Sequence, residues 1–163
     1  MHILIKKKFL YYNNYRIKCA IGKRGIKTKR KEGDFITPRG IFRIKLILYR
    51  KDRIKNFKTF VPKLSITKKM GWCDDPKSKK YNKLIKYPFE FSSEKLFRKD
   101  NVYDIILVLD YNMNPTKKYK GSAIFIHIAK KKYDTTEGCV AIKKINLLKL
   151  IKNLKKNTKI KIA

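Results

Sequence analysis

Two almost continuously apolar runs constrain the fold most strongly. They are YDIILVLDY, residues 103–111, and SAIFIHIA, residues 122–129. Runs of this kind usually belong to central strands that are covered on both faces. The chain is therefore expected to build its core around a sheet with packing on two sides.

Other segments show the alternation expected of strands with one buried face. In GIFRIKLIL one side is predicted to carry Phe42, Ile44, Leu46 and Leu48, and the other Arg43 and Lys45. A similar alternation involves Tyr15, Ile17, Cys19 and Ile21. Asn13-Asn14 suits a tight turn, so residues 2–22 are predicted to form a hairpin. TKIKIA, residues 158–163, is predicted to return as a closing strand.

A single convincing helix is predicted near the C-terminus. Its apolar positions follow the i, i+3, i+4, i+7 spacing at Leu147, Leu150, Ile151 and Leu154. Asn146 is placed to cap its first turn, and a second, short helix is expected near residues 93–97. KEGDFITPRG (31–40) and GWCDDPKSKKYN (71–82) are predicted to be ordered loops. Together the elements predict a mainly β fold, a sandwich or barrel with one C-terminal amphipathic helix packed on it.

Length and composition indicate a folded, strongly basic chain. The 163 residues fit one domain, residues 1–163, and 43% apolar residues separate the chain from disordered proteins. Lys and Arg total 44 against 12 Asp and Glu, a net charge of +32 that would attract nucleic acid or an anionic polymer. A non-enzymatic basic module is therefore one hypothesis. The basic residues are spread from Lys6 to Lys161 and only eight are Arg, so nucleic acid is not the expected partner. A monomer is expected.

Neither a metal site nor a cofactor is predicted. The cysteines, Cys19, Cys73 and Cys139, have no CxxC spacing, and the only histidines are His2 and His127. No apolar run approaches the roughly 20 residues that span a bilayer. The first residues, MHILIKKKFLYYNN, lack the features of a signal peptide. We therefore expect neither a transmembrane segment nor an export signal in the chain.

Cys139 and His127 are the residues best suited to covalent chemistry. Singly, each is more often structural, as a satisfied core histidine or a buried, inert thiol. Together they indicate catalysis, because a cysteine needs a base or a lowered pKa to become a nucleophile, and His127 is the only interior histidine. Gly138 permits turn conformations closed to other residues, so nearby amides, including that of Cys139, could form an oxyanion hole.

Two points about this pair stay open. Glu137 is next to Gly138, and a carboxylate near the thiol disfavours the thiolate unless its side chain points away, although Lys130, Lys131 and Lys132 could offset it. Asp134 is a candidate for orienting the imidazole, but a backbone carbonyl would serve equally well.

The stretch GSAIFIHIAKKKYDTTEGCVAI, residues 121–142, resembles the catalytic signature of the L,D-transpeptidase (YkuD domain) family. In that family a histidine on a strand precedes an S/T-x-G-C turn that carries the nucleophile, and Thr136-Glu137-Gly138-Cys139 fits this turn. KEGDFITPRGIFRI, GWCDDPKSKKYN and SSEKLFRKDNVYD extend the similarity in the same order, over about residues 15–160. These motifs are similar to those of the short, single-domain bacterial members.

The resemblance implies a β-rich transpeptidase fold and acyl transfer on peptidoglycan stem peptides. Cys139 would attack the carbonyl after the third residue, a diamino acid, and His127 would act as general base and then acid. Thr136 takes the hydroxyl position of the turn. An amine acceptor would produce a cross-link, whereas water would make the protein an L,D-carboxypeptidase. A different envelope glycan or peptide substrate is a further alternative.

Some residues depart from the family pattern or stay unassigned. Members commonly carry Arg two residues after the nucleophile, where this chain has Ala141. Arg98 is the suggested substitute for a substrate contact, and Trp72 is a second substrate-binding candidate. Asp74-Asp75-Pro76 is expected to shape a turn whose Asp side chains bond nearby amides. The family implies the periplasm or cell envelope, where a disulfide between Cys19 and Cys73 would be allowed, whereas the missing signal leaves a cytoplasmic start open.

Overall fold

Residues 2–163 are described by a computed structural model, which contains short strands and one helix. The strands are β1 (His2–Lys6), β2 (Phe9–Tyr12), β3 (Tyr15–Lys18), β4 (Ile26–Lys27), β5 (Thr37–Pro38), β6 (Gly40–Tyr49), β7 (Lys63–Ser65), β8 (Met70–Cys73), β9 (Leu84–Lys86), β10 (Ser93–Lys95), β11 (Ile105–Leu109), β12 (Phe125–Ile128), β13 (Val140–Ile142) and β14 (Lys159–Ile162). The helix, α1, spans Lys144–Asn153.

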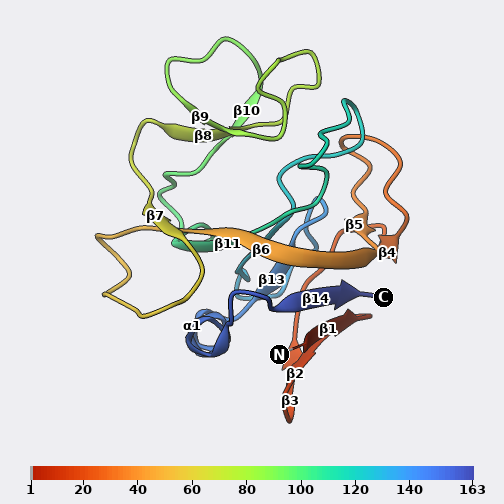
Figure 1. The fold of residues 1–163 in the computed structure, drawn as a ribbon, viewed down its shortest axis with the longest axis vertical. Helices are drawn as coiled ribbons and strands as arrows, with labels where there is room; N and C mark the ends of the chain where they lie inside the picture. The colour runs from red at the N-terminus through yellow and green to blue at the C-terminus, as the bar shows by residue number, and fades with distance from the viewer. Residues whose placement is uncertain (1) are drawn as a thin grey trace.

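The main sheet is organised around β6, which crosses the middle of the molecule (Figure 1). Its strand order is β13-β12-β11-β6-β14-β1-β2-β3, with β7 also paired to β6, and the sheet is nearly closed and barrel-like. A second sheet, β10-β8-β9, lies at the opposite end of the molecule from β1, β2 and β3 (Figure 1). This mainly β architecture with one C-terminal helix confirms the predicted fold class.

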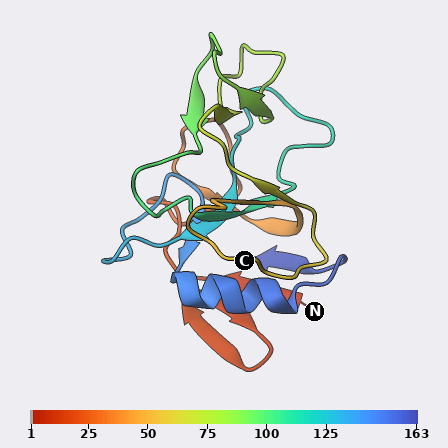
Figure 2. The same cartoon turned by 90° about the vertical axis from the view of Figure 1, so that its left-hand side faces the viewer.

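A hydrophobic cluster covers each face of the main sheet. The helix-side cluster includes Ile105, Leu107 and Leu109 of β11 together with Leu147, Leu150 and Ile151 of α1. The site-side cluster includes Ile106 and Val108 of β11, Phe125 of β12 and Trp72 of β8. Figure 2 shows α1 in the half of the molecule away from the β10-β8-β9 sheet, so the two faces have different coverings. Every residue of β11 and β12 is buried, which confirms that the two apolar runs are central strands.

The predicted one-sided alternation of β6 is wrong in its second half. Phe42 and Ile44 pack with the helix-side cluster, whereas Leu46 and Leu48 pack with the site-side cluster. The reason is a β-bulge, because the neighbouring residues Val108 and Leu109 of β11 pair with Leu46 and Ile44 and skip Lys45. One extra residue in a strand reverses the faces of all the residues beyond it.

The N-terminal segment forms three antiparallel strands where a single hairpin was predicted. β2 pairs with β1 on one side and with β3 on the other. The predicted turn at Asn13-Asn14 joins β2 to β3, with Asn13 at φ 47°. A second turn follows β1, with Lys7 at φ 54°. Lysine is not a turn-favouring residue, so sequence alone gave no sign of that turn.

The C-terminal elements agree with the sequence except at the helix cap. Leu147, Leu150 and Ile151 are buried on α1, and β14 closes the sheet between β1 and β6. The N-cap residue is Lys143 and makes no side-chain capping bond. Asn146 therefore lies inside the first turn, and its predicted capping role is wrong.

The short helix expected near residues 93–97 does not form. Ser93–Lys95 is strand β10, in which Glu94 pairs with Trp72 of β8. Pairing with a neighbouring strand outweighs the weak helical preference of so short a segment. The two predicted loops are also partly extended, because residues 71–73 belong to β8 and residues 37–38 form β5.

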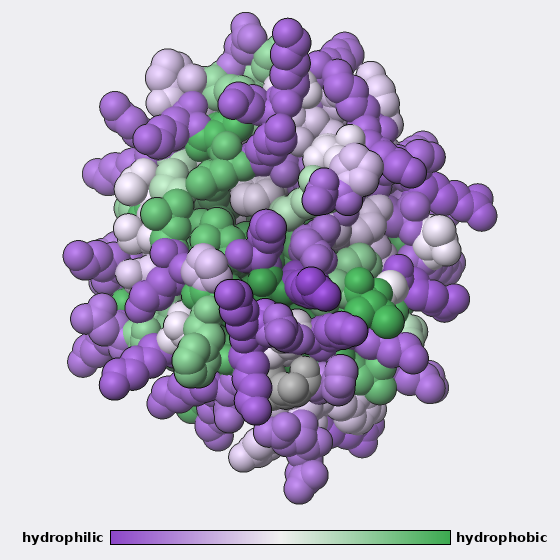
Figure 3. Space-filling model, in the orientation of Figure 1, coloured by the Kyte–Doolittle hydropathy of each residue, from purple (hydrophilic) through white to green (hydrophobic). Residues whose placement is uncertain are grey.

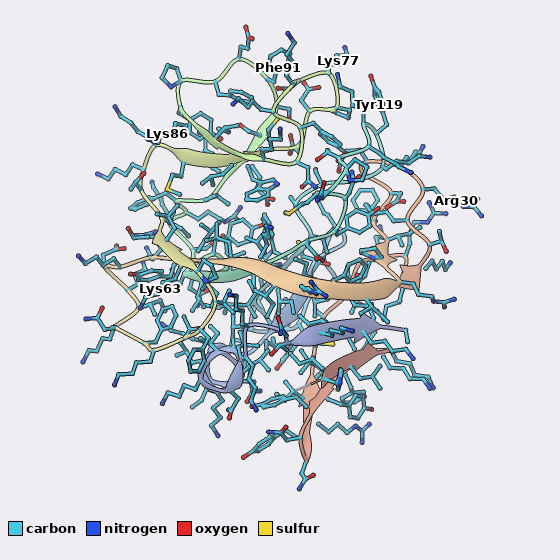
Figure 4. All side chains as sticks on the ribbon, viewed as in Figure 1. Arg30, Lys63, Lys77, Lys86, Phe91 and Tyr119 are labelled. Atoms are coloured by element: carbon cyan, nitrogen blue, oxygen red, sulfur yellow. The ribbon has the colours of Figure 1, made fainter. Side chains whose placement is uncertain are left out.

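Basic and other hydrophilic side chains are distributed widely over the surface. They cover the face drawn in Figure 3 without gathering at one end. The labelled Arg30, Lys63, Lys77 and Lys86 lie at separate places on the periphery in Figure 4. Within residues 2–163, no helix has the length and apolarity needed to cross a membrane.

Candidate active site

His127 and Cys139 meet at one cavity because β12 and β13 are parallel neighbours. His127 pairs with Ala141, so Cys139, two residues earlier, lies level with Phe125. His127 and Phe125 share a face of β12, the face of the site-side cluster, since alternate residues of a strand point the same way. Both predicted catalytic side chains line a cavity of about 390 Å³ on this face.

The Cys139 thiol is held by two main-chain groups. It donates a hydrogen bond to the carbonyl oxygen of Ala123 (3.1 Å), and the amide of Phe125 donates to its sulfur (3.3 Å). Burial raises the pKa of Cys139 above its ordinary value, and the charge of Glu94 raises it further. In the free protein the sulfur is therefore a protonated thiol.

His127 is oriented by the backbone carbonyl of Ile128, which is 3.0 Å from its Nδ1. A carbonyl only accepts, so Nδ1 carries the hydrogen and Nε2 has the lone pair that a base needs. The imidazole is 7% exposed, and Tyr103 packs edge-on against it at 5.3 Å between ring centres. Burial lowers the pKa of His127 to about 4. The imidazole is thus neutral at ordinary pH, and a carbonyl, the second of the two predicted alternatives, fixes its tautomer.

The turn before β13 exposes one main-chain donor beside the thiol. Thr136 Oγ1 donates to the carbonyl of Cys139 (2.5 Å) and accepts from the amide of Gly138 (3.2 Å). Gly138 has φ +147°, and a Cβ there would lie 2.9 Å from the carbonyl oxygen of Ile36. The Cys139 amide donates no hydrogen bond to any residue in 2–163. That amide is the donor best placed to bind an oxyanion, whereas the Gly138 amide already donates its hydrogen bond to Thr136 Oγ1.

Trp72 has a structural position. It is 4% exposed, packs edge-on against Phe125 at 5.4 Å, and is absent from the cavity lining. Its Nε1 donates to Asn82 Oδ1 (3.0 Å), which also accepts from the amide of Ala123 (3.1 Å). Since the carbonyl of Ala123 accepts a hydrogen bond from the Cys139 thiol, Trp72 is linked to that thiol only through Asn82 and Ala123. The expected contact with substrate has no support in this geometry.

A second network ties the segment 29–37 to the cavity wall. Glu32 accepts from Tyr81 Oη (2.5 Å) and from Ser122 Oγ (2.7 Å). Asp34 receives the Lys29 ammonium at 2.5 Å and the amides of residues 30, 31 and 36. Glu32, Tyr81 and Ser122, which are far apart along the chain, thus meet beside the cavity.

A family model described as the L,D-transpeptidase catalytic domain, YkuD, matches residues 2–162. The chain belongs to this family. A search of curated proteins gave no match.

In this L,D-transpeptidase domain one wall of the cavity is acidic, and the sequence had not predicted these acidic residues as part of the site. Asp74, Glu94 and Tyr103 all line the cavity, and the Tyr103 hydroxyl donates to Glu94. Asp75 bonds the amide of Lys77 as predicted for a turn, but Asp74 Oδ1 is buried without a partner in residues 2–163. The turn role predicted for both aspartates is therefore wrong for Asp74. In the sequence, the only hint of this acidic wall was the pair of aspartates that follows Trp72 and Cys73.

The remaining candidates of this L,D-transpeptidase domain divide into lining and structural residues. Arg98 lines the cavity, but its guanidinium binds Asp100 through two hydrogen bonds of 2.9 and 2.6 Å. Asp134 is an exposed lining residue. Ala141 contributes only a methyl group to the lining. Cys19 and Cys73 are buried free cysteines, so the two do not form a disulfide. Within residues 2–163, no group of three or more His, Cys, Asp or Glu side chains is arranged to hold a metal ion.

Proposed function

We propose that the chain is a cysteine L,D-transpeptidase that acts on peptidoglycan stem peptides. The observation that carries the proposal is a neutral thiol and a neutral imidazole on one cavity, beside an amide that has no hydrogen-bond partner within residues 2–163. Membership of the L,D-transpeptidase catalytic-domain family supports the reaction class. The place of action we propose is the cell envelope, where stem peptides occur.

Acylation begins when His127 takes the proton of Cys139. The S–H turns from the Ala123 carbonyl to His127 Nε2, and sulfur bonds to the carbonyl carbon after the third residue of the stem. The Cys139 amide stabilises the oxyanion, an effect that contributes about 10²–10³ in rate in other acyl-transfer enzymes. The bond to the terminal D-amino acid then breaks, and His127 returns the proton to the leaving nitrogen. General acid–base catalysis of this kind contributes about 10²–10⁴.

The thioester is consumed by the reverse sequence. An amine of a neighbouring stem attacks the carbonyl, the carbon–sulfur bond breaks, and the proton passes through His127 to sulfur. This outcome is a cross-link and is our leading proposal. With water as the acceptor the same intermediate gives an L,D-carboxypeptidase.

The nucleophile is tested by intact mass spectrometry after incubation with a tetrapeptide stem or a carbapenem. We expect one adduct, which peptide mapping assigns to Cys139. Cys139→Ala should form no adduct and release no D-amino acid, while its circular dichroism stays unchanged. Cys73→Ala is the matched control, because it also removes a free thiol but leaves the cavity lining intact. An adduct that persists in Cys139→Ala would remove Cys139 from the mechanism.

A further inference from the structure

The charged residues of the chain are segregated along the sequence. All twelve acidic residues lie within residues 32–137. Residues 1–31 contain eleven basic residues and residues 138–163 contain eight, and neither segment contains Asp or Glu. The two segments meet in the fold, because β14 pairs with β1, which leads on to β2 and β3. This end of the main sheet is therefore built from strands whose charged side chains are all basic.

The exposed side of these strands and of the first half of β6 forms one continuous surface, which we call the basic sheet face. The other side packs in the helix-side cluster, to which Ile3, Leu10 and Ile160 belong. With strands about 4.8 Å apart, a row across all five of them is about 19 Å long. The central row consists of Ile41, Lys161, Leu4, Tyr11 and Arg16, which are paired in register. The rows beside it add Arg43, Lys159, Lys6, Phe9 and Lys18.

The cations of the basic sheet face have no acidic partners. Six exposed basic side chains belong to it, namely Lys6, Arg16, Lys18, Arg43, Lys159 and Lys161. None of the six forms an ion pair with a carboxylate within residues 2–163. Asp110 lies at the edge of the face, where it accepts a hydrogen bond from the main-chain amide of Arg43 (2.8 Å). The positive charge of this surface is thus left to attract an anionic partner.

Apolar side chains are interleaved with these cations. Ile41 is 65% exposed, and Leu4 and Tyr11 are half-buried. A groove of about 480 Å³ opens on the face, and its lining includes these three side chains together with Lys159 and Lys161. No residue that lines this groove also lines the candidate active-site cavity. The face therefore offers apolar contact and positive charge at one place, separate from the cavity.

We propose that the basic sheet face binds the surface of an anionic phospholipid membrane. Each lysine or arginine close to such a surface strengthens binding about fivefold. Ile41, Leu4 and Tyr11 enter the boundary between headgroups and acyl chains, as apolar and aromatic side chains of interfacial proteins do. The groove accommodates one lipid, whose glycerol and first acyl carbons contact the apolar walls while its phosphate meets Lys159 and Lys161.

Two soluble polyanions fit the face less well. A free phosphodiester polymer would satisfy the cations but would leave Ile41 and Leu4 in water. Single-stranded nucleic acid stacks its bases on aromatic rings, whereas the Arg16 guanidinium already covers the ring of Phe9, 3.9 Å from its centroid. A lipid surface supplies the anionic and the apolar component together.

Binding through this face also orients the molecule. β1, β2 and β3 lie at the opposite end from the β10-β8-β9 sheet (Figure 1). The small sheet, which contributes Glu94 to the cavity lining, then points away from the bilayer. The proposal goes beyond the proposed function, because it assigns a second surface that takes no part in acyl transfer.

Co-sedimentation of the full chain with vesicles tests the proposal. Vesicles of phosphatidylcholine are compared with vesicles in which about a third of the lipid is phosphatidylglycerol. We expect at least about tenfold tighter binding to the anionic vesicles. Lys159→Gln combined with Lys161→Gln should weaken that binding about thirtyfold, because two of the charges at the groove are lost.

A matched pair of substitutions separates the face from the net charge. Lys77→Gln combined with Lys86→Gln removes the same charge from exposed positions, both of which lie far from β1–β3 in Figure 4. This variant should weaken binding less than about threefold, because its charges lie more than a Debye length from the lipid. Circular dichroism checks that both variants keep the fold.

A second pair of substitutions tests the apolar contact. Ile41→Thr keeps a β-branched residue in the strand and should weaken binding to the anionic vesicles about fivefold. Ile145→Thr is the control, because Ile145 is 62% exposed but lies on α1, which packs on the other side of these strands. Its effect should be less than about twofold.

The outcomes that overturn the proposal are distinct. They are equal affinity for the two kinds of vesicle, no binding to either, and equal losses in the two lysine pairs. An unchanged affinity in Ile41→Thr would assign the face to a soluble polyanion instead. Fluorescence anisotropy with a labelled oligothymidylate covers nucleic acid, which would be the partner if it binds more tightly than the anionic vesicles and displaces them. The assays involve no acyl transfer, so their result is independent of the proposed function.

Discussion

At the scale of single residues, the surroundings keep both catalytic candidates uncharged. Burial is the first cause of the lowered pKa of His127, about 4, and the Ile128 carbonyl offsets it only in part. Burial is also the first cause of the raised pKa of Cys139. A thiol and an imidazole are therefore present from about pH 5 to about pH 8, and no thiolate–imidazolium pair forms in advance.

This protonation state predicts an acylation rate that is nearly constant from about pH 5 to about pH 8. The reactive form is the neutral pair, and its population falls only as His127 takes up a proton near pH 4. Single-turnover acylation followed by intact mass gives the profile. Thiolate absorbance near 240 nm, compared with Cys139→Ala, should show no difference at neutral pH. A rate that rises with a midpoint between pH 6 and pH 8 contradicts the prediction and indicates a preformed thiolate.

The sequence pointed to two candidate catalytic residues that share one cavity, but not to the charged residues around them. His127 lies on β12 and Cys139 directly precedes the next strand, β13, so their spacing and the lack of another interior histidine pointed to this pair. Asp74 directly follows β8 and Glu94 lies on β10, two strands of the separate small sheet, far in sequence from the thiol. Their role depends on how two sheets stack, and local patterns contain no information on that stacking.

At the scale of secondary-structure elements, Asn82 joins the small sheet to the strand that carries His127. It is 3% exposed and uses all four of its side-chain hydrogen-bonding positions. Its Oδ1 accepts from Trp72 Nε1 and from the Ala123 amide, and its Nδ2 donates to the carbonyls of residues 111 and 112. The backbone that holds the Cys139 thiol is thus fixed by the side-chain amide of a residue between β8 and β9, two strands of the small sheet.

Removing this side chain should destabilise the fold and disturb the nucleophile together. We expect Asn82→Gly to lower the free energy of unfolding by about 3 kcal/mol, since several buried groups lose their partners. Glycine is chosen because Asn82 has φ 57°, which alanine would adopt only with strain. Urea unfolding is followed by the fluorescence of Trp72, the single tryptophan. Asn153→Ala is the control, since Asn153 makes one exposed bond to Lys149 and should cost less than about 0.5 kcal/mol. A cost for Asn82→Gly as small as that of the control refutes the bridging role.

Element boundaries show where pattern reasoning loses information. The runs that became β11 and β12 were identified because burial on both faces leaves a continuous apolar signal. The faces of β6 were misassigned because one skipped residue, Lys45, leaves no trace in composition. β10 was assigned to a helix because its three residues acquire their conformation from pairing with β8.

At the scale of the whole molecule, two buried groups link stability to pH: His127, which lines the cavity, and Asp34, which lies in the adjoining segment 29–37. Asp34 fastens the segment 29–37, whose Ile36 carbonyl approaches Gly138 and whose Thr37 hydroxyl donates to the Cys139 carbonyl at 3.5 Å. Burial alone would raise the pKa of Asp34, but the Lys29 ammonium and three backbone amides lower it to about 2. His127 on β12 is kept neutral because burial lowers its pKa. Both groups bind a proton less readily in the folded state than in the unfolded chain.

Stability should therefore fall on acidification in two successive windows. As pH falls from about 6.5 to about 4, His127 takes up a proton in the unfolded chain before it can do so in the folded state. This difference lowers the free energy of unfolding by about 3 kcal/mol. As pH falls from about 4 to about 2, protonation of the unfolded aspartate removes a further contribution of about 2 kcal/mol. Urea unfolding across this range measures both losses. His127→Asn should flatten the upper window and Asp34→Asn the lower one, each relative to the wild-type slope. If the free energy of unfolding of His127→Asn falls as steeply between about pH 6.5 and pH 4 as that of the wild type, other groups cause the loss. His127 would then have the same pKa in the folded and unfolded chains.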